Sequence, residues 1–251
     1  MRHYLLLAIL LIHSLFSNLA VSDEIVLVAD VWCPYNCEPN SDTPGYLIEI
    51  AQYAFEKEGH TIKYLTLPWS RAIQMVRNGE YHGIVGTGKS ETPEFIFPKE
   101  PLIRSEHVFY TNLENKWTYD GLESLKKINL GVINDYSYGA LYEEYIRENA
   151  KNSKQITTVF GDDGLNRLIK MLEKRRIDAF IEEKQTILEY LKRSNREVTF
   201  KSAGVGSEEQ IFIAFSPNNA GSKKYAKILS KGYKELRSSG KLEILKRIYG
   251  L

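Results

Sequence analysis

The feature that most constrains the fold is an alternation of apolar runs and amphipathic helical patterns that occurs twice along the chain. Predicted strands lie at residues 25–29, 62–67, 83–86, 128–133, 156–159, 177–181 and 211–215, and predicted helices at 47–55, 71–77, 139–149, 165–172, 186–193, 222–238 and 241–249. Strands that alternate with helices predict an α/β fold with mostly parallel sheets. The restart after a polar stretch at residues 112–127 predicts a second lobe.

The first 22 residues have the layout of a secretory signal peptide. Arg2 and His3 precede an apolar stretch from Leu5 to Phe16, and Ala20-Val21-Ser22 fits a cleavage site with small residues. The alternative is a retained membrane anchor, but the apolar stretch is shorter than the ~20 residues that a spanning helix needs. We therefore predict export to the periplasm and a mature chain that begins near Asp23.

The charge of the mature chain argues against two classes of partner. Loss of Arg2 from the 33 basic residues leaves as many basic as acidic residues, since the chain has 32 of the latter. A neutral chain has no electrostatic footprint for nucleic acid or for an anionic membrane.

Cys33 and Cys37 are the two cysteines of the chain. In an oxidising compartment they can form a disulfide, which closes so short a loop that it stabilises by about 2 kcal/mol and mainly stiffens the turn that carries Tyr35. A metal site is the alternative, but no histidine or second cysteine pair lies nearby. A redox role is the third alternative, but it is more usual for Cys-x-x-Cys, and the spacing here is one residue longer.

Two segments share one pattern: the end of an amphipathic helix, a turn and an apolar strand. They are residues 75–86 and 171–182. In open α/β sheets, ligands bind beyond the carboxyl ends of strands. Two facing lobes would therefore place Thr87, Gly88 and Lys89 opposite Glu182 and Glu183.

Several segments, in this order and spacing, carry a resemblance to a known family. They are Pro44–Ile50, Pro68–Ala72, Glu91–Glu94, Phe97–Leu102, Gly131–Ile133, Arg176–Glu183, Ser239–Leu242 and Tyr249–Leu251. The chain resembles the type II periplasmic solute-binding proteins that bind polar amino acids for ABC importers, over nearly all of its mature length.

The resemblance implies a fold and a function. The first lobe would comprise residues 23–111 and 214–251, the second lobe residues 112–213, with strands crossing near Tyr110–Leu113 and Gln210–Phe215. The implied function is capture of a small polar, amino-acid-like ligand in the cleft between the lobes of a monomer, with an ABC permease as partner and no cofactor or metal. A sensory binding protein without its own transporter is the alternative.

The chain departs from the family at the ligand clamp. The family's Arg after Thr-Pro-Glu is absent, since Phe95 follows Thr92-Pro93-Glu94. Arg71 is the first candidate to replace it, because guanidinium binds carboxylate with two parallel hydrogen bonds; Lys89 is the second. The alternative for Arg71 is a surface residue paired with Glu49 or Glu80. Arg71→Ala would then cost about 2 to 5 kcal/mol of affinity.

Other candidate ligand-binding residues follow predicted strands or open predicted helices: Tyr35, Trp69, Thr87, Tyr136, Ser137, Tyr138, Asp162, Glu182 and Glu183. The helix start at residues 134–139 offers backbone N–H groups to an anion, although Asp135 or Ser137 can equally cap that helix. Asp162 is likewise either a cap or a cleft residue. Glu183 corresponds to the family's Asp for a ligand amine.

An enzyme is the rival class, since some proteins with this fold dehydrate cyclic acids. Glu182 and Glu183 could then act as acid and base. The sequence has no Ser-His-Asp order, no HExxH and no phosphate-binding glycine loop, and its histidines are scattered. We therefore predict a binding protein and not an enzyme.

Overall fold

The computed structural model describes residues 22–134, 136–161, 163–194 and 196–251. The predicted signal peptide, apart from Ser22, and the candidate Asp162 lie outside these residues. Within them, no helix combines the length and the apolar character that crossing a bilayer requires.

The first lobe is built on three parallel strands. They are β1 (Glu24–Ala29), β2 (Thr61–Thr66) and β3 (Gly83–Thr87), with β1 paired to both others. Its helices are α2 (Tyr46–Glu56), α3 (Trp69–Asn78), α8 (Ser222–Ser238) and α9 (Lys241–Tyr249). The predicted bounds of the last two helices match the structure.

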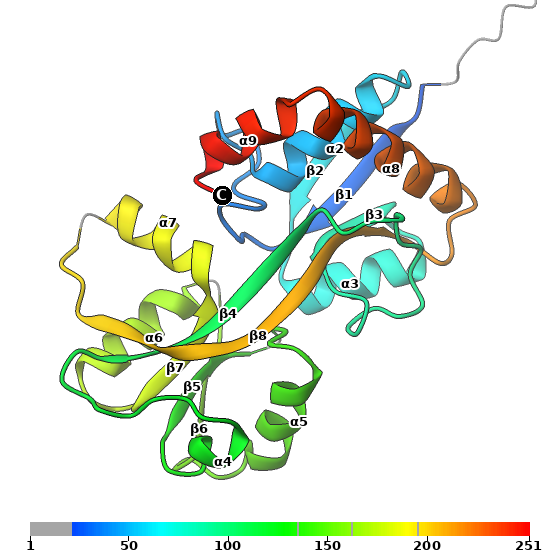
Figure 1. The fold of residues 1–251 in the computed structure, drawn as a ribbon. Coiled ribbons are helices and arrows are strands. Elements are labelled where there is room, and N and C mark those ends of the chain that lie inside the picture. The colour runs from blue at the N-terminus through cyan, green and yellow to red at the C-terminus, as the bar shows by residue number, and fades with distance from the viewer. Residues whose placement is uncertain (1–21, 135, 162, 195) are drawn as a thin grey trace, which may run out of the picture.

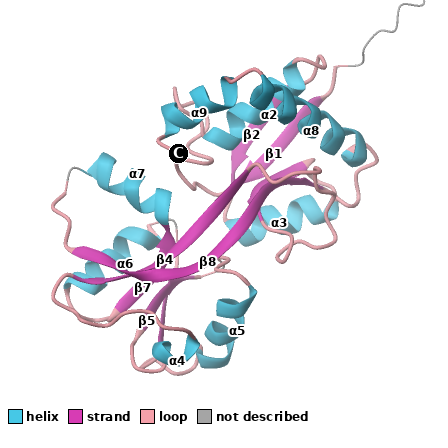
Figure 2. Ribbon diagram, viewed as in Figure 1, coloured by secondary structure: helices cyan, strands magenta, loops and turns pink. Residues whose placement is uncertain are grey.

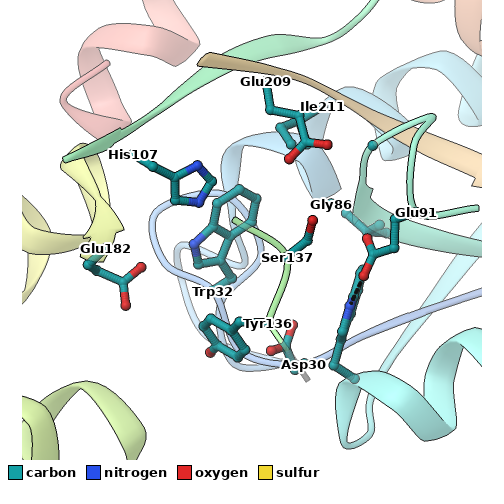
Figure 3. A pocket seen from close by; sticks show the side chains of 13 residues that line it. Asp30, Trp32, Gly86, Glu91, His107, Tyr136, Ser137, Glu182, Glu209 and Ile211 are labelled. Atoms are coloured by element: carbon teal, nitrogen blue, oxygen red, sulfur yellow. Dashed lines mark hydrogen bonds between the residues drawn. The ribbon is translucent and has the colours of Figure 1, made fainter. Parts of the chain in front are cut away.

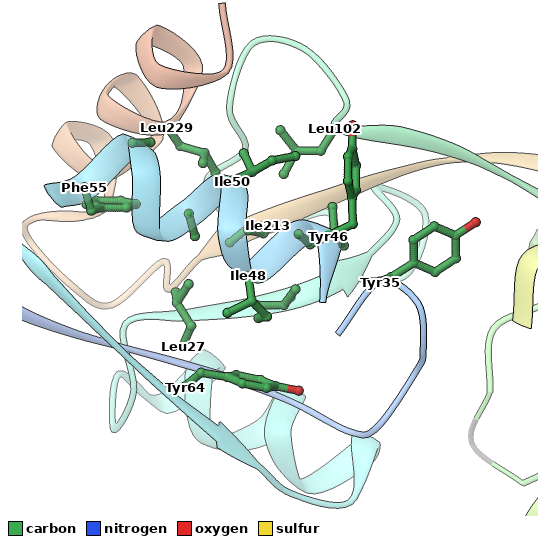
Figure 4. Close-up of a cluster of buried hydrophobic side chains, with 14 of the residues drawn as sticks. Leu27, Tyr35, Tyr46, Ile48, Ile50, Phe55, Tyr64, Leu102, Ile213 and Leu229 are labelled. Carbon is green, nitrogen blue, oxygen red and sulfur yellow. The ribbon is translucent and has the colours of Figure 1, made fainter. Parts of the chain in front are cut away.

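Alternation along β1 explains why helices cover both faces of these strands. Ile25 and Leu27 pack in one cluster with α2, α8 and α9, whereas Val28 packs in another with Ala72 and Val76 of α3. Figure 4 shows Leu27 in the first of these clusters. Successive side chains of a strand point to opposite faces, so a strand buried on both faces is apolar throughout. Figure 2 shows the resulting layers.

The second lobe repeats this plan. Its parallel strands are β5 (Leu130–Ile133), β6 (Ile156–Val159) and β7 (Ala179–Glu183), and its helices are α4 (Leu122–Leu125), α5 (Ala140–Asn149), α6 (Gly164–Glu173) and α7 (Lys184–Ser194). Two apolar clusters lie on the two faces of these strands.

Two long antiparallel strands, β4 (Ile103–Asn112) and β8 (Phe200–Phe215), join the lobes (Figure 1). The strand order is β2-β1-β3-β8-β4-β7-β5-β6. β8 pairs with β3 at Phe212–Phe215, and β4 pairs with β7 from His107 to Thr111. The strands therefore change partner around Ile103–Glu106 and Glu208–Ile211, and residues 108–110 already pack in the second lobe.

Candidate functional site

A pocket lies between the lobes, where the carboxyl ends of their strands face each other (Figure 3). It is lined by Asp30, Trp32, Trp69, Val85, Gly86, Gly88, Glu91, His107, Tyr136, Ser137, Glu182, Glu209 and Ile211. An adjoining cavity shares Asp30, Trp69 and Tyr136 and extends to Glu38, Ser70 and Asn134, among others. Lysine and arginine are absent from the described residues that line either cavity.

Three aromatic rings form the apolar wall of the pocket: Trp32 after β1, Trp69 at the start of α3 and Tyr136 after β5. Gly86 has φ of 95°, a left-handed conformation that favours glycine, and a Cβ there would lie 3.3 Å from the Trp32 ring. Glycine at this position therefore lets the indole pack against the end of β3.

Glu91 is held at the first-lobe side of the pocket. Trp69 Nε1 donates to its Oε1 at 2.6 Å, and the Thr87 hydroxyl donates to its Oε2 at 3.1 Å. Burial raises the pKa of Glu91 to about 7, although these two hydrogen bonds act in the opposite direction. The candidate Thr87 is itself buried and thus positions Glu91.

Glu209 of β8 reaches the same side. Ser90 Oγ donates to its Oε1 at 3.0 Å, and burial is the main cause that raises its pKa. A Cβ on Gly88 would lie 2.1 Å from that oxygen. Glycine at position 88 therefore leaves room for the carboxyl group of Glu209.

Glu182 at the end of β7 has an unsatisfied oxygen. Its side chain is 2% exposed; Oε1 accepts the backbone N–H of Glu183 at 2.8 Å, and Oε2 has no hydrogen-bond partner. Burial raises the pKa of Glu182 to about 8. Buried polar atoms are normally hydrogen-bonded, so this oxygen marks a place for a donor from a ligand.

Glu183, by contrast, is satisfied by the protein. Its carboxylate accepts hydrogen bonds from the hydroxyl of Tyr35 at 3.0 Å and the backbone N–H of Thr186 at 2.9 Å. It does not line the pocket. Because Tyr35 belongs to the first lobe and Glu183 to the second, this candidate pair joins the lobes, and neither residue lines the pocket.

Tyr136 and Asp30 form a second link between the lobes. Burial is the main cause that raises the pKa of the Tyr136 phenol. The charge of Asp30 and a hydrogen bond to its carboxylate also raise this pKa. Figure 3 shows the two side chains together at one wall of the pocket. The candidate Tyr136 therefore lines the cleft and also contacts the facing lobe.

His107 on β4 is the one titratable base among the described lining residues of the pocket. Burial lowers its pKa to about 4, so the imidazole is neutral at pH 7. Its Nδ1 lies 3.5 Å from the Ser207 hydroxyl, and its ring contacts Tyr138 edge-on. The lining of the pocket therefore contains several acidic groups and a neutral histidine.

The two candidate carboxylate clamps do not reach the pocket. Arg71 is exposed, although Trp69 two residues earlier lines the cleft. The glutamates considered as its partners accept hydrogen bonds elsewhere, Glu49 from Tyr249 and Glu80 from Asn78. Lys89 is exposed and lies over the rings of Phe97 and Phe212, at 5.7 and 5.1 Å from their centroids.

The helix start predicted to bind an anion already holds a carboxylate. Ser137 lines the pocket, but its hydroxyl donates at 2.5 Å to Glu143 in the first turn of α5. Tyr138 is buried, and its hydroxyl accepts the backbone N–H of Ile133 at 2.8 Å. Tyr138 therefore supports the loop without lining the pocket.

Nine lining residues were not among the predicted site residues, and five of these carry an aromatic or ionisable side chain: Asp30, Trp32, Glu91, His107 and Glu209. Asp30 and Trp32 directly follow β1, so the rule of carboxyl strand ends could have found them. Glu91 lies in a segment that carried the family resemblance. His107 and Glu209 lie on parts of the crossing strands that the sequence pattern did not predict as strand.

A disulfide joins Cys33 and Cys37, with Cα atoms 4.8 Å apart. The loop that it closes carries Tyr35, and Trp32 precedes it. No group of three or more His, Cys, Asp or Glu side chains in the described part of the chain is arranged to hold a metal ion.

Comparison with known proteins finds similarity in structure only. No family model matches the chain, and no curated protein matches it. A histidine kinase sensor domain with similarity to periplasmic binding proteins superposes with a TM-score of 0.72 and 18% identity, covering 90% of this chain and 95% of the other.

Two further solved structures belong to binding and import systems. An ancestral arginine-binding protein bound to arginine has a TM-score of 0.70 and 18% identity, covering 91% of this chain and 98% of the other. A chain from a study of glutathione import via GshT and the cystine ABC importer TcyBC of Streptococcus mutans has a TM-score of 0.73 and 16% identity, covering 91% and 94%. The chain therefore has the two-lobed fold of the type II periplasmic binding proteins, among which its structural neighbours are of the amino-acid-binding kind.

Proposed function

We propose that this protein is an exported solute-binding protein that captures a small organic cation between its lobes and delivers it to an ABC permease. The single observation that carries the proposal is Glu182 Oε2, a buried carboxyl oxygen without a partner that faces a pocket devoid of lysine and arginine among its described residues. An ammonium or guanidinium group would supply the missing donor.

The charges around the pocket support a cation over an anion. Asp30, Glu91, Glu182 and Glu209 all line it, and burial raises the pKa of the three glutamates. Burying an unpaired charge is costly, so a cation that pairs with these groups gains more than a neutral ligand does. Tryptophan faces attract the same cations.

The predicted carboxylate clamp is therefore not part of this proposal. A ligand carboxylate in this pocket would meet acidic side chains, and both Arg71 and Lys89 lie outside its lining. The proposal thus keeps an amine-bearing ligand and drops the requirement for an α-carboxylate.

A binding role also fits the two glutamates better than acid–base chemistry does. The carboxylate of Glu183 accepts hydrogen bonds from Tyr35 and Thr186, and Glu183 does not line the pocket. It is therefore not placed to act as acid or base, together with Glu182, on a ligand in the pocket. Among the structural neighbours, an ancestral arginine-binding protein is bound to arginine or to glutamine, and the GluR0 ligand-binding core from Nostoc punctiforme is bound to L-glutamate, which supports a binding role.

Calorimetric titration of residues 23–251 at pH 8 tests the proposal. The panel pairs primary amines and guanidinium compounds with carboxylates, neutral amino acids and sugars. We expect heat and a raised melting temperature with cations alone, and weaker binding by Glu182→Gln. Binding of carboxylates or sugars, with no cation bound, would contradict the proposal.

A sensory role for the same capture step has one specific support, the similarity to a histidine kinase sensor domain. Import and signalling differ in the membrane partner and not in the cleft. Genes for a permease and an ATPase beside the gene for this chain, or their co-purification with it, would favour import; a membrane receptor in their place would favour signalling.

A further inference from the structure

We propose that the ligand of this cleft is a dication, with two cationic nitrogens joined by a short apolar segment and without a carboxylate. The inference rests on the proposed function, since it names the class of cation that the same pocket takes. Its basis is the placement, at two separate ends of the pocket, of acidic groups that form no salt bridge with a described residue: Glu182 at one end, and Glu91 and Glu209 at the other.

The strand register separates the two acidic ends. Glu209 of β8 lies opposite Ser105 of β4, and Glu182 of β7 lies opposite Val108 on the other edge of β4. Three residues along a strand span about 10 Å and neighbouring strands lie about 5 Å apart, so the Cα atoms of the two glutamates are roughly 14 Å apart. Figure 3 shows these carboxyl groups on different sides of the pocket.

Each end retains capacity for a cation. Glu182 uses one oxygen for the backbone N–H of Glu183 and leaves Oε2 without a partner, although the side chain is 2% exposed. At the other end, Glu91 and Glu209 accept hydrogen bonds from hydroxyl and indole groups, which carry no positive charge. One small cation can contact only one end, because charge pairing weakens with distance.

The region between the ends is aromatic. The rings of Trp32 and Tyr136 lie between Glu182 and Glu91 in Figure 3, and the neutral His107 lies above them. Rings offer methylene groups an apolar surface. An extended chain with a cation at each terminus therefore matches the order acid, ring, acid along the pocket.

A carboxylate at either end of the ligand would find no lysine or arginine among the described residues that line the pocket. The start of α5, which could otherwise bind an anion, faces the pocket with Ser137 hydrogen-bonded to Glu143. The charge of Glu143 further raises the pKa of Glu91 and of Glu209. An ω-amino acid should thus bind less well than the diamine of equal length.

Straight-chain α,ω-diamines of three to eight carbons are the probes. Each is titrated calorimetrically at pH 8 against the monoamine and the ω-amino acid of the same length. We expect one diamine length to bind at least tenfold tighter than its matched monoamine, with the ω-amino acid weakest.

Three variants locate the two ends. Glu182→Gln and Glu209→Gln should each lower diamine affinity at least tenfold while changing monoamine affinity less. Glu208→Gln is the matched control, since Glu208 precedes Glu209 on β8, is exposed and does not line the pocket. Melting curves identify any variant that fails to fold, and the chain-length series on the parent protein then still decides the question.

The outcomes separate the two proposals. Monoamines that bind as tightly as every diamine would overturn the dication and leave the cation proposal standing. Tighter binding of ω-amino acids would also overturn it. Absence of binding by every amine would overturn both.

Discussion

The hydroxyl of Tyr35 donates a 3.0 Å hydrogen bond to Oε1 of Glu183, which lies 148 residues away in the facing lobe. Tyr35 is 1% exposed and Glu183 also 1% exposed, so the bond is shielded from water. It holds the disulfide loop of the first lobe against the end of β7. We therefore expect closure of the cleft to depend on a pair that does not line the pocket.

Tyr35→Phe should weaken ligand binding by about 1 to 3 kcal/mol, because the closed state then buries a carboxyl oxygen with one donor fewer. Calorimetric titration of the variant with a cation that the parent protein binds measures this loss of affinity. Tyr46→Phe is the matched control, since Tyr46 is equally buried in the first lobe but its hydroxyl has no hydrogen-bond partner. Equal losses in both variants would count against a role for the bond between the lobes.

The stability of the ligand-free protein should fall as pH rises from about 5 to 8. Burial raises the pKa of Glu182 to about 8, whereas a glutamate in an unfolded chain has a pKa of about 4.3. The folded state therefore holds the proton more tightly, and this contribution is present below the unfolded pKa and is lost as pH rises through the folded pKa. Glu182→Gln should flatten the decline, by up to a few kcal/mol, in denaturant titrations across this range.

The same ionisation should make cation affinity rise between pH 6 and 8 in the parent protein and less so in Glu182→Gln. A proton and the ligand cation compete for the carboxylate, so removal of the proton favours the ligand. An affinity that stays constant over this range in the parent would show that Glu182 does not contact the cation.

Arg71→Ala should change ligand affinity by less than about 0.5 kcal/mol, because Arg71 is exposed and its loss resembles other surface substitutions. Trp69→Ala, two residues earlier, should weaken binding at least tenfold through loss of the pocket wall and of the donor to Glu91. If instead Arg71→Ala cost the 2 to 5 kcal/mol expected of a carboxylate clamp, the sequence-based prediction would be restored.

Gly88→Ala should lower cation affinity about tenfold, since its Cβ would lie 2.1 Å from Oε1 of Glu209 and displace that carboxyl group. The cost in folding should be small, because the displaced atom is the far end of a flexible side chain. Ser90→Ala removes only the hydrogen bond to the same oxygen and should have a weaker effect in the same titration. A larger effect of Ser90→Ala would contradict the steric argument.

The local pattern of the chain was sufficient to predict most elements. The apolar spacing in Ser222–Ser238 and Lys241–Tyr249, separated by Gly240, determined two helices whose predicted bounds match the structure. The continuous apolar run of β1 and the helical spacing of α2 likewise determined both elements, because each depends on periodicity within a dozen residues. Glu182 was predicted at the cleft because it ends such a strand.

Tertiary structure decided most of the length of the two crossing strands, since the sequence pattern predicted only residues 211–215 of β8 as a strand, and with it part of the site. Strand β4 pairs with β8 between residues as distant as Ile103 and Ile211, and mixed polar side chains such as those of His107 and Glu209 face the cleft, so no local alternation marked these parts of the two strands. The same holds for Arg71 and Glu91: both lie near strand ends, and only the packing of α3 against the first lobe turns one outward and the other into the pocket. Which side chain faces a cleft depends on contacts between segments far apart in the chain, and a sequence pattern reports contacts within one segment.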